Sequence, residues 1–134
     1  MARNLMEFWA NLPDDPFDAF YMNAPIMMHS IDENGVITKV SNFWAAALGF
    51  EPEDMIGHKS TEFLTEESRE RAVKVHFPAF RAEGQIRNVQ FDFVRKDKSL
   101  LPVVLSASSH YDADGNFTRS LAVIFDNEDS HGIC

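Results

Sequence analysis

Apolar side chains at the start of the chain recur at helical spacing. An i, i+3, i+4, i+7 pattern, which Pro13 ends, predicts an amphipathic helix whose apolar stripe is Leu5, Met6, Phe8, Trp9 and Leu12. Asp15 and Pro16 then supply an N-cap and a first helical residue. The short helical turn that follows, through Phe17 and Phe20, is predicted to be a connector.

Two apolar runs, at residues 26–31 and 36–40, flank a polar tetrapeptide at 32–35. The tetrapeptide ends in Asn34-Gly35, and these residue types tolerate the positive φ angles that a tight strand turn needs. The pattern therefore predicts a β-hairpin.

A helix is predicted next, capped by Ser41 or Asn42 and ended by Gly49. Small polar side chains at an N-cap accept helix N–H groups, and glycine tolerates the left-handed conformation at the C-terminal end. Residues 51–64 contain proline, glycine, serine and threonine at short intervals, which predicts two short turns instead of one long helix.

A longer helix is expected to begin at Thr65 and to end at Gly84. One face of this helix, at α-helical spacing, consists of Val73, His76, Phe77 and Phe80. Pro78 lies inside that pattern and lacks a backbone N–H, so the helix should be kinked or its hydrogen bonding shifted locally.

The spacing of apolar residues changes from 3.6 to 2 in the last third of the chain. Residues 86–94, 100–111 and 117–125 alternate between apolar and polar positions, with turn residues between them, and so predict three hairpin-connected strands. The order of elements indicates an α+β domain in which one antiparallel sheet packs helices on one face.

Composition limits the number of domains and the kinds of partner. The 134 residues suit a single domain, and the net charge of -9 disfavours a nucleic-acid backbone because no basic cluster offsets it. No apolar run long enough for a membrane span or a signal peptide is present. The single cysteine, Cys134, excludes an internal disulfide and fits a cytoplasmic protein.

Several local motifs, in order, resemble the PAS family of sensory domains. The matching segments are the turn 32–35, the capped helix 41–50 ending in Leu-Gly-Phe, the Glu-Asp-Met-Ile-Gly segment 53–57, the turn 95–98 and Asp126. Lys98 stands where that family usually has glycine, so a different type of turn is an alternative at this position. The element order β-β-α-α-α-β-β-β is also that of the family.

The resemblance implies a five-stranded antiparallel sheet over residues 20–128. Outside that range, the periodicity assigns residues 1–19 to an N-terminal cap or dimerisation helix with its connector, and residues 129–134 are interpreted as a truncated C-terminal linker. Such a module senses or interacts in bacterial-type signal transduction, as in two-component systems, and regulates an output domain of the histidine kinase or cyclic-dinucleotide enzyme type. The chain ends about eight residues after Asp126, so any output domain is expected C-terminal to this segment, unless none exists.

The family's strand phase implies a site between the helices and the inner sheet face. The implied residues are His29, Phe43, Trp44, Phe63, Val73, His76, Phe77, Phe80, Val89, Phe91, Phe93, Leu105, Ala107, Ala122 and Ile124. Aromatic residues at helical spacing often fill a core, whereas the small Ala107 and Ala122 argue for open space. A pocket here would take a small apolar or aromatic ligand.

Cofactors of other family members can be tested against these residues. A flavin–cysteine adduct and a cysteine-linked chromophore are excluded, because no cysteine lies in the helical block. A haem-binding member has a histidine eleven residues before the helix-ending glycine, where this chain has Val73. His76 and His29 fit a packing role better than a haem ligand role, so haem is disfavoured and no metal site is predicted. The identity of any cofactor stays unknown.

Apolar residues of opposite phase form a second sheet surface, which includes Leu121, Val123 and Phe125. An apolar face of this kind usually marks an interface. The N-terminal stripe is predicted to cover it, either within one chain or in a homodimer.

A small cone-shaped isomerase or hydrolase is an alternative use of this architecture. Such an enzyme needs a carboxylate with a Tyr or His inside its cavity, but no carboxylate lies on the predicted inner face. We therefore expect no enzymatic activity. A ligand-free interaction module remains open beside the ligand sensor.

Overall fold

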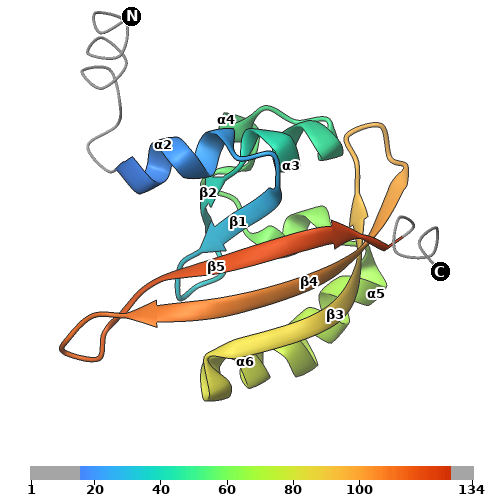
Figure 1. Ribbon diagram of the computed structural model, residues 1–134. Helices are drawn as coiled ribbons and strands as arrows, with labels where there is room; N and C mark the ends of the chain where they lie inside the picture. The colour runs from blue at the N-terminus through green and yellow to red at the C-terminus, as the bar shows by residue number, and fades with distance from the viewer. Residues whose placement is uncertain (1–15, 128–134) are drawn as a thin grey trace, which may run out of the picture.

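A computed structural model describes residues 16–127 as five strands and a set of short helices (Figure 1). The strands are β1 (Met27–Ile31), β2 (Ile37–Val40), β3 (Gln85–Val94), β4 (Leu100–Tyr111) and β5 (Phe117–Asp126). The helices are α2 (Pro16–Asn23), α3 (Asn42–Leu48), α4 (Pro52–Met55), α5 (Glu66–Arg71) and α6 (Phe77–Glu83), with a 3₁₀ turn at Ser60–Phe63 and a π-helical turn at Ala72–His76.

The five strands form one antiparallel sheet in the order β2-β1-β5-β4-β3. Helices α5 and α6 run along one face of this sheet, as Figure 1 shows. The main hydrophobic core lies between that face and the helices, with Trp44, Leu48 and Val103 fully buried. The predicted α+β architecture is therefore confirmed.

Helix α2 lies on the opposite face of the sheet. Tyr21 of this helix and Ala24, the residue that follows it, pack with Met28 of β1 against the partly buried Leu121 and Val123 of β5. The segment predicted to be a connector is thus a packed helix that covers part of the outer face. The predicted N-terminal helix at residues 5–12 lies outside the described residues.

The predicted hairpin forms, although its turn differs from the expected one. Gly35 has a φ of +81°, whereas Asn34 is not among the residues with positive φ. Asp32 closes the turn, because its carboxylate accepts hydrogen bonds from the backbone N–H groups of Asn34 at 2.8 Å and Val36 at 3.0 Å. The turn at 95–98 keeps a left-handed residue, since Lys98 itself has a φ of +76°.

The long helix contains a π-helical turn directly before Pro78. The N–H of Phe77 donates to the carbonyl of Ala72, five residues earlier, instead of to the residue four earlier. The predicted shift of hydrogen bonding is confirmed, and it has a consequence for the site. Because one extra residue enters the turn, the side chains before it rotate relative to those after it.

Strand β3 contains a bulge opposite Ser106. Ile86 pairs with Ala107 and Val89 pairs with Leu105, so two residues of β3 face one of β4. Asn88 takes a φ of +54° there, and its N–H donates to the Ser106 hydroxyl at 2.9 Å. The bulge reverses the alternation of side chains along the strand, which places Ile86 on the inner face.

Candidate functional site

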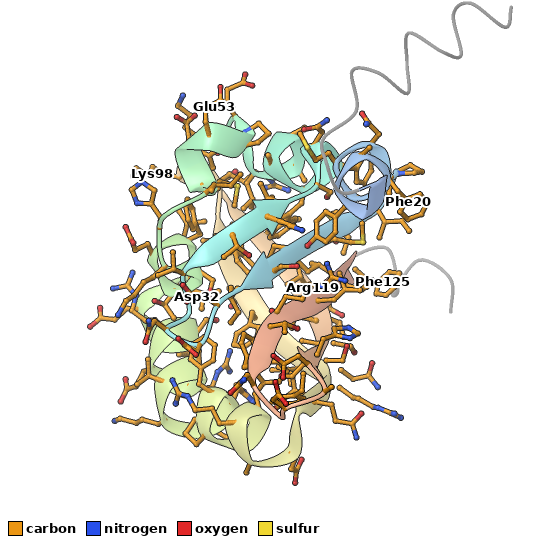
Figure 2. The ribbon with its side chains drawn as sticks, turned by 90° about the vertical axis from the view of Figure 1, so that its left-hand side faces the viewer. Phe20, Asp32, Glu53, Lys98, Arg119 and Phe125 are labelled. Atoms are coloured by element: carbon orange, nitrogen blue, oxygen red, sulfur yellow. The ribbon has the colours of Figure 1, made fainter. Side chains whose placement is uncertain are left out.

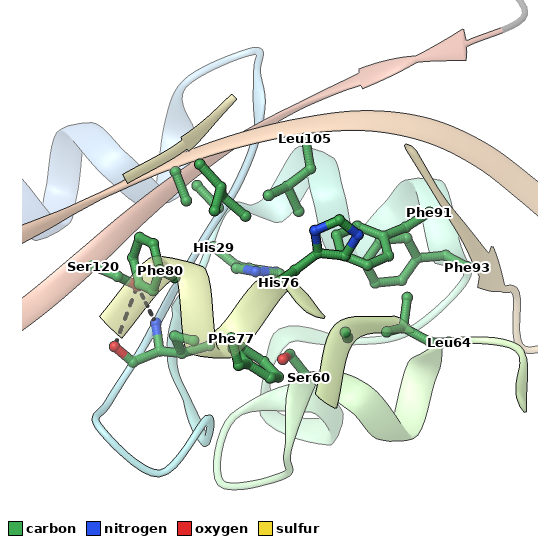
Figure 3. A pocket seen from close by; sticks show the side chains of 15 residues that line it. His29, Ser60, Leu64, His76, Phe77, Phe80, Phe91, Phe93, Leu105 and Ser120 are labelled. Carbon is green, nitrogen blue, oxygen red and sulfur yellow. Dashed lines mark hydrogen bonds between the residues drawn. The ribbon is translucent and has the colours of Figure 1, made fainter. Parts of the chain in front are cut away.

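A cavity lies between the long helical segment and the inner sheet face (Figure 3). It offers about 50 Å³ to the centres of water-sized molecules. Because this figure counts only the positions of the centres, the space itself is larger, and it has room for several waters or one small organic molecule. The predicted site residues on its wall are His29, His76, Phe77, Phe80, Phe91, Phe93, Leu105, Ala107 and Ala122.

One row of paired residues forms the sheet side of the cavity. Ala107 of β4 pairs with Ala122 of β5, and Ala122 pairs with His29 of β1. Two methyl side chains beside an imidazole leave space above the sheet that longer side chains would fill. The small residues that favoured open space in the sequence therefore lie side by side at the cavity.

His29 is the most unusual polar group in the cavity wall. Its side chain is on the inner face of β1, and the residue is only 5% exposed. Figure 3 shows the imidazole pointing from β1 into the middle of the group of lining residues. Burial lowers the pKa of His29 from 6.5 to about 4, so the ring is neutral at pH 7.

The Nδ1 atom of His29 is buried and has no hydrogen-bond partner within the described part of the chain. The indole Nε1 of Trp44 is likewise buried without a hydrogen-bond partner among the described residues. The ring centroids of Trp44 and His29 lie 6.5 Å apart. Burying a polar group without a partner costs about 1–3 kcal/mol. Each such group in a folded protein therefore needs an explanation, such as a water or a ligand.

Two serines line the cavity, one on the sheet side and one on the helix side. The Ser120 hydroxyl accepts from the N–H of Ile31 at 2.9 Å and donates to the carbonyl of Ile31 at 3.3 Å. It thus ties β5 to β1. Ser60, in the 3₁₀ turn, is on the helix side of the cavity (Figure 3).

His76 is half-buried at the edge of the cavity. Its ring packs edge-on against Phe91, with 5.3 Å between the ring centroids. Burial, and secondarily the positive charge of Arg71, lower the pKa of His76. This histidine is thus also biased toward its neutral form.

Two predicted site residues point away from the cavity. Phe43 and Val73 are 51% and 56% exposed. In α3 the buried side consists of Trp44, Ala45 and Leu48, which leaves Phe43 outside. In the long helix the π-helical turn brings Ala72, and not Val73, into line with the inward-facing Phe77.

Four further predicted residues contribute to the core without lining the cavity: Trp44, Phe63, Val89 and Ile124. Trp44 packs edge-on against Phe93 at 4.8 Å between centroids. It therefore supports the cavity wall from behind.

Lining residues that the predicted site lacked are Ile31, Ser60, Leu64, Ala72, Ile86 and Ser120. Ile31 and Ser120 share the strand phase of His29 and Ala122, so extending the alternation by one step would have found them. Ile86 reaches the cavity only because of the bulge, for which the sequence has no simple signal. Ala72 reaches it because of the π-helical turn, which Pro78 indicates without showing which residue is brought inward.

The outer sheet face is partly covered. Leu121 and Val123 are packed under α2, whereas Phe125 at the end of β5 is 60% exposed. Phe20 of α2 is 68% exposed, and Figure 2 shows both aromatic side chains on the same side of the molecule. The stripe that was predicted to cover this face lies outside the described residues.

The cavity does not fit the cofactors of some PAS-type sensors. A space that admits several waters is much smaller than a flavin or haem ring system. No cysteine occurs within residues 16–127 to bind a chromophore. In the same range no cluster of three or more His, Cys, Asp or Glu side chains could hold a metal ion.

Comparisons with known proteins agree with this architecture. The family model described as the PAS fold matches residues 16–126. The PAS domain of an HTR-like protein from Haloarcula marismortui superposes with a TM-score of 0.69 at 22% identity, covering 93% of this chain and 96% of that one. A search of curated proteins finds no match.

Two further solved structures show the same fold at lower identity. The Cycle PAS-B domain of Drosophila melanogaster, with bound ethylene glycol, has a TM-score of 0.67 at 13% identity and covers 75% of this chain and 99% of that one. A light-oxygen-voltage domain studied with a flavin analogue has a TM-score of 0.72 at 17% identity, covering 90% of this chain and 92% of that one.

The fold and the family match define a signalling module of the sensory or interaction class. The chain belongs to the PAS family. Within the described residues no helix is long and apolar enough to cross a membrane.

Proposed function

We propose that this PAS domain senses a small molecule that binds in the cavity between the long helical segment and the sheet. The observation that carries the proposal is the buried imidazole of His29, whose Nδ1 atom has no partner among the described residues. A bound molecule with a hydrogen-bonding group would remove this cost. The Cycle PAS-B domain, described with bound ethylene glycol, supports a ligand of this scale.

Signal transfer would run through β5. Ala122 and Ser120 of this strand line the cavity, and the strand ends at Asp126. A ligand that presses on Ala122 or on the Ser120 link to β1 changes the position of β5. We propose that an output domain of the histidine kinase or cyclic-dinucleotide enzyme type responds to that change in a cytoplasmic signalling protein.

The domain would act by binding and not by catalysis. General acid–base chemistry needs titratable groups that converge on a substrate. His29 and His76 are the titratable residues on the cavity wall within residues 16–127, and the pKa of each is lowered. Neither has a carboxylate beside it on that wall to orient it as a base.

Replacing Ala122 with Phe tests the cavity directly. A benzyl group at this position projects beside His29 and occupies the space, so ligand binding should be lost while the free energy of unfolding changes by less than about 1 kcal/mol. The readout is mass spectrometry of small molecules extracted from the purified protein, together with thermal shifts against metabolites. Urea titration measures stability.

Ala82→Phe is the matched control. Ala82 is exposed on α6, so this substitution makes the same chemical change outside the cavity. The small molecules extracted from this variant, and its thermal shifts with metabolites, should match those of the natural chain. A destabilisation of 1–3 kcal/mol by Ala122→Phe, with no ligand found in either protein, would indicate a filled core and contradict the proposal.

The second candidate is an interaction module that forms a homodimer through its outer face. Phe20 and Phe125, the exposed aromatic residues near α2 and the end of β5, favour it. Replacing both with Ser should weaken a dimer at least tenfold, measured by sedimentation velocity over a range of concentrations. Val75→Ser, at an exposed apolar residue of the π-helical turn, is the control. A natural chain that stays monomeric at high concentration contradicts this candidate.

A further inference from the structure

We infer that His29 is the hydrogen-bond anchor of the cavity and that it selects small uncharged molecules carrying a hydroxyl or a similar group. This inference rests on the proposed function of the cavity as a ligand site. It assigns the class of ligand and the residue that recognises it. The observation behind it is a buried imidazole in a mostly apolar wall, whose Nδ1 atom has no hydrogen-bond partner among the described residues.

The chemistry of the imidazole determines what it can bind. A neutral imidazole has one nitrogen that donates a hydrogen bond and one that accepts. A hydroxyl group also does both, so one hydroxyl can satisfy whichever nitrogen faces it. Ser120 is less suited to this role, because its hydroxyl already donates to the carbonyl of Ile31 and accepts from the Ile31 N–H, which leaves it no proton to donate to a ligand.

The wall disfavours charged ligands. Within residues 16–127 no Lys, Arg, Asp or Glu lines the cavity, and the remaining lining side chains are mostly aromatic, aliphatic or alanine. A carboxylate or an ammonium group brought here would lose its hydration without gaining an opposite charge. The ligand is therefore uncharged, with an apolar part that contacts Phe80 or Leu105.

The space limits the size of the ligand. The cavity admits a molecule of only a few non-hydrogen atoms, up to about the size of one six-membered ring, unless side chains move. At the best known binding energy per atom, a four-atom ligand reaches a Kd of about 40 µM and no tighter. Binding must therefore be measured by a method suited to weak complexes.

The test is a titration of the isotope-labelled chain by NMR with three probes: ethylene glycol, acetate and xenon. Ethylene glycol and acetate have equal numbers of heavy atoms and differ in charge, while xenon fills apolar space without hydrogen bonds. At pH 7 we expect ethylene glycol and xenon to shift the amide signals of Ala122 and Ile31. Acetate should bind at least tenfold more weakly than the glycol.

Two variants assign the anchor. His29→Leu keeps a side chain of similar size and removes both nitrogens, so the Kd for ethylene glycol should rise about tenfold while xenon still binds. Ser60→Ala removes the hydroxyl on the helix side and should change that Kd by less than about threefold. Equal glycol affinity in His29→Leu, a larger loss in Ser60→Ala, or tighter binding of acetate than of glycol would each overturn the inference.

Failure of the proposed function gives a different result. If xenon and glycol both leave the cavity amides of the natural chain unchanged, the cavity takes no ligand and both proposals fall. If xenon binds but His29→Leu binds ethylene glycol as tightly as the natural chain, the cavity remains a ligand site and only the assignment of His29 as the anchor is wrong. Xenon binding to Ala122→Phe, which should be absent, checks that the signals report the cavity.

Discussion

Between pH 6.5 and pH 4 the natural chain is expected to lose about 3 kcal/mol of its free energy of unfolding relative to His29→Leu. Burial holds the pKa of His29 at about 4 in the folded state, against 6.5 for an exposed histidine. The unfolded chain therefore binds a proton in this range that the folded chain does not, and stability falls as the pH falls. Each pKa unit corresponds to 1.36 kcal/mol.

Urea titrations at intervals from pH 7 to pH 4 measure this difference. Comparison with His29→Leu is needed because other groups also titrate: the pKa values of Asp97, Asp112 and Glu62 are lowered as well, by hydrogen bonds to nearby backbone and side-chain groups. These carboxylates affect both proteins alike. His76, the other titratable residue on the cavity wall among the described residues, is also common to both.

His76→Gln provides a second comparison. The pKa of His76 is lowered too, yet this residue is only half-buried, so solvent screens its charge. Replacing His76 should therefore reduce the loss of unfolding free energy between pH 6.5 and pH 4 much less than replacing His29. Parallel pH profiles for the natural chain and His29→Leu would mean that burial does not hold the pKa of His29 low in the folded state, and the account of a buried, neutral imidazole would be wrong.

The sequence predicted the sheet and the residues that begin and end the helices, because those features depend on local rules. Ser41 caps α3 by accepting the N–H of Trp44, and Gly49 and Gly84 end their helices with φ angles of +84° and +75°. Strand alternation placed Ala107 and Ala122 on the inner face. Each of these predictions depends on residues within one or two turns of the position concerned.

The parts of the site that the sequence could not place depend on interruptions of those rules. A single extra residue in the π-helical turn brings Ala72 inward and leaves Val73 outside, although both are small apolar side chains. A single extra residue in β3 turns Ile86 inward. The absence of a partner for the Nδ1 atom of His29 among the described residues is also a property of the assembled cavity, since Trp44 and Ala122, which lie near His29, come from other parts of the chain.

Ser41→Ala is expected to lower the free energy of unfolding by about 3 kcal/mol, because one buried hydroxyl satisfies three backbone groups. The Ser41 hydroxyl accepts from the N–H groups of Met28 and Trp44, each at 3.1 Å, and donates to the carbonyl of Ile26 at 2.7 Å. Losing the helix cap costs about 1 kcal/mol, and buried groups left unpaired cost about 1–3 kcal/mol.

Thr65→Ala is the matched control, since Thr65 caps α5 by accepting only the N–H of Ser68 in the described part of the chain. It should cost about 1 kcal/mol, so the difference between the two variants in urea titrations reports the two additional bonds of Ser41. Because Ser41 links α3 to the strand that carries His29, loosening it should also weaken glycol binding. Equal destabilisation by the two substitutions would show that Ser41 acts as a helix cap alone.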